Sequence, residues 1–173
     1  MLTPGGKVLT PQETVELLEH AVSMAATGMP RGFGDGDWDS SVWPKDTFEE
    51  LTRDVLWTAM GDPDVGIRWR ATHAVVNELT RDAKTVLPAF LCRLAKENFS
   101  PCVSQKLPFY VQDSRLHFLL ALSKVAKEIS GAIQNCAGDL ISFLRKQDHV
   151  LIRYLGWAAL RSAGVSEKKY YRH

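Results

Sequence analysis

A short phrase occurs twice in this chain, and it restricts the fold more than any other feature. Residues 67–75 read IRWRATHAV, and residues 152–160 read IRYLGWAAL. In both copies an Ile-Arg pair precedes an aromatic residue, a small residue lies three positions after the arginine, and an Ala-apolar pair lies three positions further on. Repetition of this kind is typical of folds in which one supersecondary unit packs on the next. The phrase therefore predicts a repeat protein.

Apolar residues recur at helical spacing over most of the chain, which predicts an all-α protein. The first helix is predicted to begin with the reciprocal capping pattern of Thr10 and Glu13, with Pro11 at its first position. A loop rich in Gly, Asp and Trp follows, and residues 98–112 show little periodicity. Further helices are predicted over about 47–60, 64–80, 84–97, 113–130, 132–146 and 148–163.

Pairing consecutive helices gives three hairpins, and the phrase lies in the second helix of the first and third. The middle hairpin has a weaker copy, with Phe118 where the others have a small residue. Matching Ala74, Ala121 and Ala159 gives separations of 47 and 38 residues. Both are close to the roughly 40–47 residues of a HEAT or armadillo unit.

These units resemble HEAT repeats over residues of about 47–163. The resemblance implies a short right-handed α-solenoid of about three helix hairpins. In that family a turn aspartate and a second-helix arginine form a ladder of hydrogen-bonded charges between neighbouring repeats. The resemblance implies this structural role for two pairs, Asp64 with Arg68 and Asp148 with Arg153.

The predicted organisation has three parts. Residues 1–46 form a capping helix and a Gly/Asp/Trp-rich loop that packs on the solenoid, because terminal units of a repeat stack must cover its open end. Residues 47–163 form the HEAT-like repeats, and residues 164–173 form a charged tail.

The bulk composition favours a soluble, cytoplasmic protein. The 21 basic and 20 acidic residues give a net charge of +1, which provides no overall field to attract nucleic acid or an anionic membrane. Cys92, Cys102 and Cys136 form no CxxC pair, and an odd number of such cysteines suits a reducing compartment. No apolar run approaches the length of a membrane span.

Grooves of α-solenoids bind segments of other proteins, so we expect a non-enzymatic interaction scaffold or adaptor with another protein or peptide as its partner. Arginine beside an aromatic ring can anchor such a segment. The predicted partner-binding residues are therefore the aromatic and basic ones of the two phrases: Trp69, Arg70, His73, Tyr154 and Trp157.

The loop before residue 47 imitates an EF-hand, which binds calcium through carboxylates at alternate positions. Ser40 occupies the position at which the sharp turn needs glycine, and this favours an ordinary surface loop anchored by Trp38 and Trp43. No metal is therefore expected, and the weak calcium candidates are Asp35, Asp37, Asp39 and Asp46.

The sequence shows no nucleophile signature, no clustered histidines and no complete phosphate-binding loop, so neither catalysis nor a cofactor is expected. Two alternatives to the scaffold stay open. One is nucleic-acid binding, as in DNA glycosylases built on HEAT-like repeats, which the neutral net charge disfavours. The other is a regulatory or sensor section of a larger multidomain protein.

Overall fold

The computed structural model describes residues 10–27, 48–95 and 108–166. Over these residues the chain is all-α, which confirms the predicted fold class. No helix in these three ranges is long and apolar enough to cross a membrane. The helices are α1 (Pro11–Thr27), α2 (Phe48–Ala59), α3 (Val65–Ala95), α4 (Pro108–Val125), α5 (Ser130–Asn135), α6 (Ala137–Arg145) and α7 (Val150–Ser162).

The chain divides into two units, residues 1–36 and 37–173. In the first unit, the backbone N–H of Thr10 donates to Glu13 Oε2 at 2.8 Å, and the N–H of Glu13 donates to Thr10 Oγ1 at 3.2 Å. This is the predicted capping pattern, and it satisfies donors that the start of α1 leaves free. The packing of residues 1–46 on the repeats stays a prediction.

In the second unit, α3 consists of two helical segments, 65–81 and 83–95. They meet at Asp82, whose backbone is extended, with φ of −148° and ψ of 70°. Asp82 Oδ1 accepts a hydrogen bond from the N–H of Thr85 at 3.3 Å, as a cap of the second segment does. The sequence predicted two helices with a boundary here, and the kink agrees with it.

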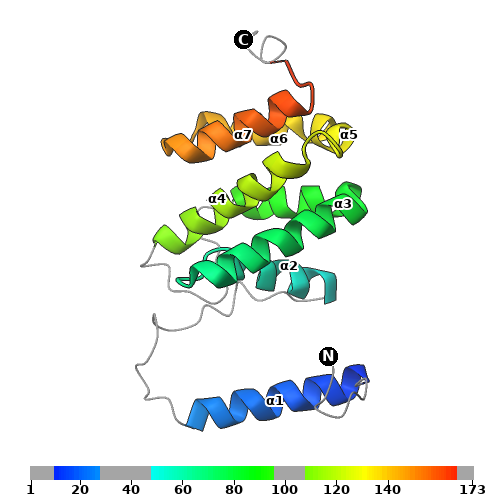
Figure 1. Ribbon diagram of the computed structural model, residues 1–173, viewed down its shortest axis with the longest axis vertical. Helices are drawn as coiled ribbons and strands as arrows, with labels where there is room; N and C mark the ends of the chain where they lie inside the picture. Colours follow the sequence, from blue (N-terminus) through cyan, green and yellow to red (C-terminus); the bar gives the residue numbers. More distant parts are fainter. Residues whose placement is uncertain (1–9, 28–47, 96–107, 167–173) are drawn as a thin grey trace. The chain divides into compact units, whose positions relative to one another are not determined.

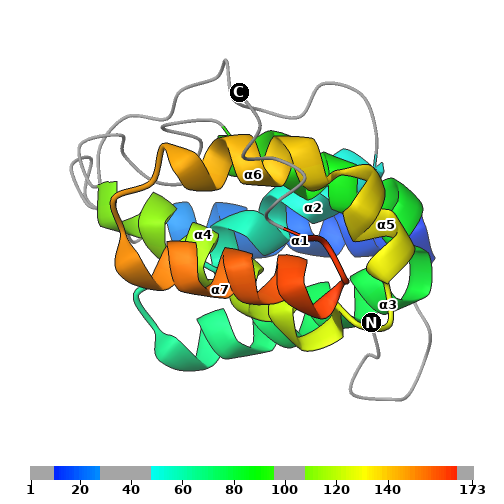
Figure 2. The ribbon, with the colours of Figure 1, turned by 90° about the horizontal axis from the view of Figure 1, so that it is seen from above.

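The helices of the second unit double back on one another in two layers (Figures 1 and 2). The first segment of α3, α4 and α7 lie side by side, with α4 in contact with both neighbours. The other layer contains α2, the second segment of α3, and α6. Successive helices therefore alternate between the layers, except for α5, a short helix between α4 and α6.

Three aromatic side chains lie at the centre of the core. Phe90 and Phe118 stack with ring centroids 5.3 Å apart and an interplanar angle of 8°. Trp57 is tilted against both, at 6.4 Å from Phe90 and 6.1 Å from Phe118. All three are buried. The middle hairpin thus departs from the small-residue pattern at Phe118 because that ring joins α2 to α3 and α4.

The small residue and the last apolar residue of the phrase are buried in both copies. Ala71 in α3 and Gly156 in α7 occupy the same position of the phrase, and both are buried. Val75 and Leu160, four residues further on, are 0% and 1% exposed. The small residue and the apolar residue of each copy therefore face the core, as close packing of stacked helices requires.

One helix begins earlier than the sequence predicted. Helix α4 starts at Pro108 instead of near residue 113, so the connection predicted over 98–112 is partly helical. Ser114 Oγ donates to the backbone oxygens of Trp57, at 2.9 Å, and Tyr110, at 3.0 Å. This contact holds the first turns of α4 against the end of α2. The spacing of hydrophobic residues did not predict the early start of α4, because the residue that holds this end of the helix is a buried serine.

The helices predicted over 113–130 and 132–146 are broken at more points than the sequence indicated. Helix α4 ends at Val125, and residues 126–129 form a turn before α5. A second break occurs at Cys136, with φ of −101° and ψ of 7°, between α5 and α6. The helix predicted over 132–146 is therefore two short helices.

Candidate partner-binding site

Trp69 is the centre of a small group of side chains on the surface of α3 and α4. Trp69 is 46% exposed. His73 meets it edge-on at 5.4 Å and 79°, and His117 meets it at 6.4 Å and 77°. Lys124 Nζ lies over the ring, 4.6 Å from its centroid. We call these four residues the Trp69 cluster.

Helical spacing explains how the cluster forms. Trp69 and His73 are one turn apart on α3, and His117 and Lys124 are two turns apart on α4, so each pair lies on one side of its helix. Because α3 and α4 pack side by side, the two pairs meet. The sequence identified the first pair, whereas finding the second required knowledge of which helices are neighbours.

His117 contacts a buried threonine of the neighbouring helix. Thr72 Oγ1 donates to the backbone oxygen of Arg68 at 2.7 Å and lies 3.0 Å from His117 Nδ1. Burial lowers the pKa of His117, the Arg68 charge lowers it further, and Asp113 opposes them. His117 is therefore neutral at pH 7.

The cluster has a positive character. Lys124 lies on the Trp69 ring, Arg68 is close enough to influence His117, and Arg70 beside Trp69 is exposed. Asp113 supplies a negative charge near His117, whose pKa it raises. Such a site is suited to a ligand that packs an apolar group on the half-exposed aromatic ring and places a carboxylate or phosphate beside the cations.

The two aromatic residues predicted from the second phrase lie on α7. Tyr154 is 61% exposed, and Trp157 is half-buried and packs against the core. Within the described helices, no ring contact joins either residue to the Trp69 cluster. A groove that includes both phrases stays a prediction.

Asp64 and Arg68, at the start of α3, form their hydrogen bonds with backbone groups of the same turn. Asp64 Oδ1 accepts from the N–H of Gly66 at 2.6 Å and of Ile67 at 3.1 Å, so it caps the helix. Arg68 Nη1 donates to the backbone oxygens of Asp62, at 2.5 Å, and Pro63, at 3.0 Å. Arg68 thus holds the turn closed, and its predicted ladder role between repeats is untested.

Helix α7, which carries the second copy of the phrase, is capped by a histidine and not by an aspartate. His149 Nδ1 accepts from the N–H of Ile152 at 3.4 Å, in the place that Asp64 occupies before Ile67. Asp148, which the sequence analysis paired with Arg153, therefore lies one position before the cap. Both Asp148 and Arg153 are exposed.

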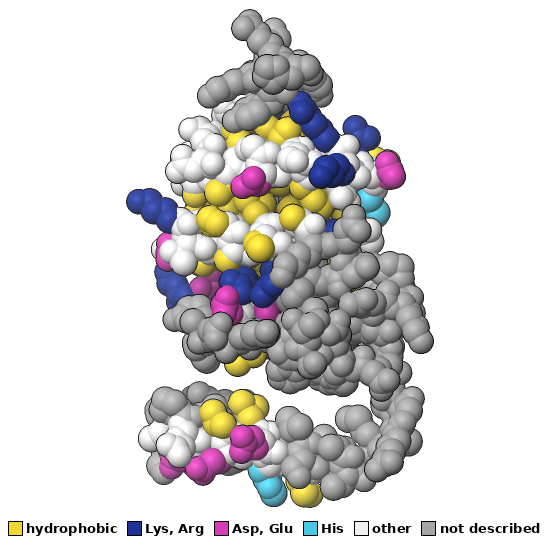
Figure 3. Space-filling model, turned by 180° about the vertical axis from the view of Figure 1, so that it is seen from behind, with side chains coloured by type: hydrophobic (Ala, Val, Ile, Leu, Met, Phe, Trp, Pro, Cys, Tyr) yellow, Lys and Arg dark blue, Asp and Glu magenta, His cyan; other side chains and the backbone are white. Residues whose placement is uncertain are grey.

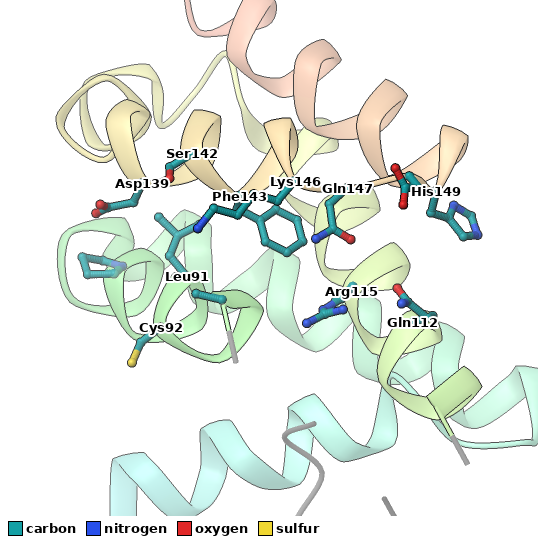
Figure 4. A pocket seen from close by; sticks show the side chains of 13 residues that line it. Leu91, Cys92, Gln112, Arg115, Asp139, Ser142, Phe143, Lys146, Gln147 and His149 are labelled. Atoms are coloured by element: carbon teal, nitrogen blue, oxygen red, sulfur yellow. The ribbon is translucent and has the colours of Figure 1, made fainter. Parts of the chain in front are cut away.

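A pocket of about 920 Å³ lies in the other layer, between the second segment of α3, α4 and α6 (Figure 4). Arg115 and Gln112 enter it from α4, opposite Phe143 of α6 and Gln147 of the following turn. None of these residues was singled out in the sequence, because they come from separate helices with no shared motif.

The sequence also gave no sign of a buried ion pair. Arg93 Nε and Nη2 donate to Asp54 Oδ1 and Oδ2 at 2.7 and 2.9 Å, and the two residues are 9% and 2% exposed. This bidentate pair joins α3 to α2. Its role is structural because both groups are enclosed by the core.

The weak calcium candidates Asp35, Asp37, Asp39 and Asp46 lie outside the described residues. Within the described ranges, no three His, Cys, Asp or Glu side chains are grouped so as to hold a metal ion.

No protein-family model, curated protein or solved structure matches this chain.

Proposed function

We propose that this chain is a non-enzymatic protein-interaction module, built as a short right-handed α-solenoid of about three HEAT-like hairpins. Two observations support this architecture. The small residue and the last apolar residue of the phrase are buried in both α3 and α7, and the first segment of α3, α4 and α7 lie side by side in one layer. Repeat proteins of this kind use an extended layer surface to bind other chains.

The Trp69 cluster is the docking surface in this proposal. The observation that carries it is the exposure of Trp69, a large apolar residue that is 46% exposed while Ala71 and Val75 of the same phrase are buried. Tryptophan and arginine dominate the binding energy of protein interfaces because they combine large contact area with directed polar groups. An exposed tryptophan with Arg70 beside it therefore has the composition of an interface centre.

The partner is a protein segment that carries an apolar side chain and an acidic residue. Its apolar side chain packs on the Trp69 ring, and its carboxylate binds Lys124 and Arg70. Opposite charge across the contact raises the association rate and selects against basic partners. We place the protein in the cytoplasm, where the free thiols of Cys92 and Cys136 stay reduced.

The test is affinity capture by the full chain from native lysate, with and without nuclease, for wild type and Trp69→Ala. We expect a protein that is retained after nuclease treatment by wild type and is lost with the variant. The matched control is Phe109→Ala, because Phe109 is an exposed aromatic residue of α4 that is not part of the predicted site, and capture should be unchanged.

Two results would reject the proposal. Capture that disappears with nuclease or moderate salt would mean that the surface binds nucleic acid, since counterion release makes such binding strongly salt-dependent. Capture that is unchanged in Trp69→Ala would mean that partners bind elsewhere.

A further inference from the structure

Helix α7 lies at one end of the layer that it forms with α4 and the first segment of α3. Among the described helices, α7 contacts α4 but not α3, so α4 lies between the two, and no described helix of this layer lies beyond α7 (Figure 1). The outer face of a terminal repeat is normally polar. Figure 3, which views the unit from the α6 side, instead shows hydrophobic side chains beside Lys and Arg side chains at this end.

The repeated phrase indicates which side of α7 faces away from α4. In α3, Trp69 and Thr72 contact the next helix of the layer: the Trp69 ring lies 6.4 Å from the His117 ring, and Thr72 Oγ1 lies 3.0 Å from His117 Nδ1. Tyr154 and Trp157 occupy the same two positions of the phrase in α7. They therefore lie on the side of α7 against which a further helix would pack.

This side of α7 presents an apolar stripe that ends in a cation. Val150 is 76% exposed and Tyr154 is 61% exposed, Trp157 is half-buried, and Arg161 is exposed. Their spacings of four, three and four residues place them along one side of the helix, and we call these four residues the α7 stripe. Large apolar side chains exposed together mark interaction surfaces.

The two ends of α7 carry opposite charges. Asp148 precedes the helix cap and Arg161 lies in the last turn; both are exposed, and neither forms an ion pair with a described residue. Two copies of α7 packed antiparallel would place Asp148 of one copy beside Arg161 of the other, and Tyr154 beside Trp157, each twice by symmetry. A parallel pair would instead bring like charges together. The stripe is thus complementary to a second, antiparallel copy of itself.

We propose that this chain forms a symmetric dimer through the α7 stripe. The aromatic side chains of the two copies pack at the centre, and the Asp148–Arg161 pairs flank them and fix the antiparallel direction. Because the same surface of both copies is used, the contact covers both open ends and the assembly closes at two chains. The inference rests on the matching positions of α3 and α7 and is independent of the partner proposed for the Trp69 cluster.

The test is sedimentation velocity of the full chain over a range of concentrations, where we expect the wild type to change from monomer to dimer. Asp148→Arg brings two arginines together at each end of the contact, and Arg161→Asp brings two aspartates together. Each variant alone should associate about tenfold or more weakly than wild type, since like charges across an interface repel. In an equal mixture of the two variants every charge meets an opposite one, so a mixed dimer should form.

Two further variants serve as controls, after circular dichroism has shown equal helicity for all the proteins. Lys84→Asp changes an exposed charge on α3, which does not contact α7, and should leave the dimer intact. Trp69→Ala should also leave it intact, which separates this contact from the Trp69 cluster. A wild-type chain that is monomeric throughout would assign the stripe to a different protein and overturn the proposal. A mixture no heavier than its separate variants would overturn it as well.

Discussion

Gly156 of α7 lies directly against the side chain of Leu144 of α6. A Cβ added at Gly156 would be 2.4 Å from Leu144 Cδ2 and 2.7 Å from Cδ1, and Leu144 is fully buried. Such overlap forces the two helices apart, so Gly156→Ala should destabilise the protein by about 1–3 kcal/mol. Chemical denaturation followed by circular dichroism measures the change.

The matched control is Gly138→Ala in α6, where nothing lies within 4 Å of the added Cβ. Alanine there should be neutral or stabilising by up to about 1 kcal/mol, since glycine is the poorer helix former. If both variants had the same stability, α6 and α7 would not pack closely at this glycine.

The Asp54–Arg93 pair leads to a second prediction. Asp54→Asn removes the carboxylate that accepts hydrogen bonds from both Nε and Nη2 of Arg93, so it should cost about 3–5 kcal/mol of unfolding free energy. Arg53→Gln is the control, because Arg53 Nε is 3.6 Å from Asp54 and its side chain is more exposed. That change should cost less than about 1 kcal/mol. If Asp54→Asn and Arg53→Gln lowered the unfolding free energy equally, the Asp54–Arg93 pair would contribute no more than the contact with Arg53.

Stability should depend on pH through His117. Its pKa is lowered from 6.5 in the folded protein by burial and by Arg68, so the unfolded chain takes up the proton first as pH falls. Stability is therefore lost from about pH 6.5 downward until the folded pKa is reached, and is constant below it. His117→Gln should have a shallower loss of stability in this range. An identical pH profile for wild type and variant would contradict the assigned environment.

Lys124 should affect how fast the partner binds. Lys124→Gln removes the charge over the Trp69 ring and should lower the association rate and its salt dependence. Lys127→Gln, three residues further along the chain, removes an equal charge without a ring contact and should have less effect. Stopped-flow mixing at two salt concentrations separates these results, and equal effects would indicate general charge attraction only.

The sequence predicted the helices well because their apolar spacing is regular and their ends carry strong local signals. Thr10 with Glu13 is such a signal, and the structure has the predicted hydrogen bonds. The boundary predicted between the helices over about 64–80 and 84–97 corresponds to the kink at Asp82 within α3. The HEAT-like solenoid and the ladder of Asp64, Arg68, Asp148 and Arg153 stay predictions.

Features that depend on which helices are neighbours were not accessible from the sequence. His117 and Lys124 complete the Trp69 cluster only because α4 packs beside α3. Asp54 and Arg93 resemble ordinary surface charges, yet the fold encloses both. His149 replaces an aspartate as a helix cap, and nothing in its local pattern distinguishes a capping histidine from an exposed one.

The central claim is that the Trp69 cluster binds a partner segment. Isothermal titration of the captured partner into wild-type and Trp69→Ala protein tests it most directly, after circular dichroism has shown equal helicity. We predict affinity at least about tenfold weaker for the variant, as loss of an interface hot spot requires. Equal affinity in two equally folded proteins would contradict the account.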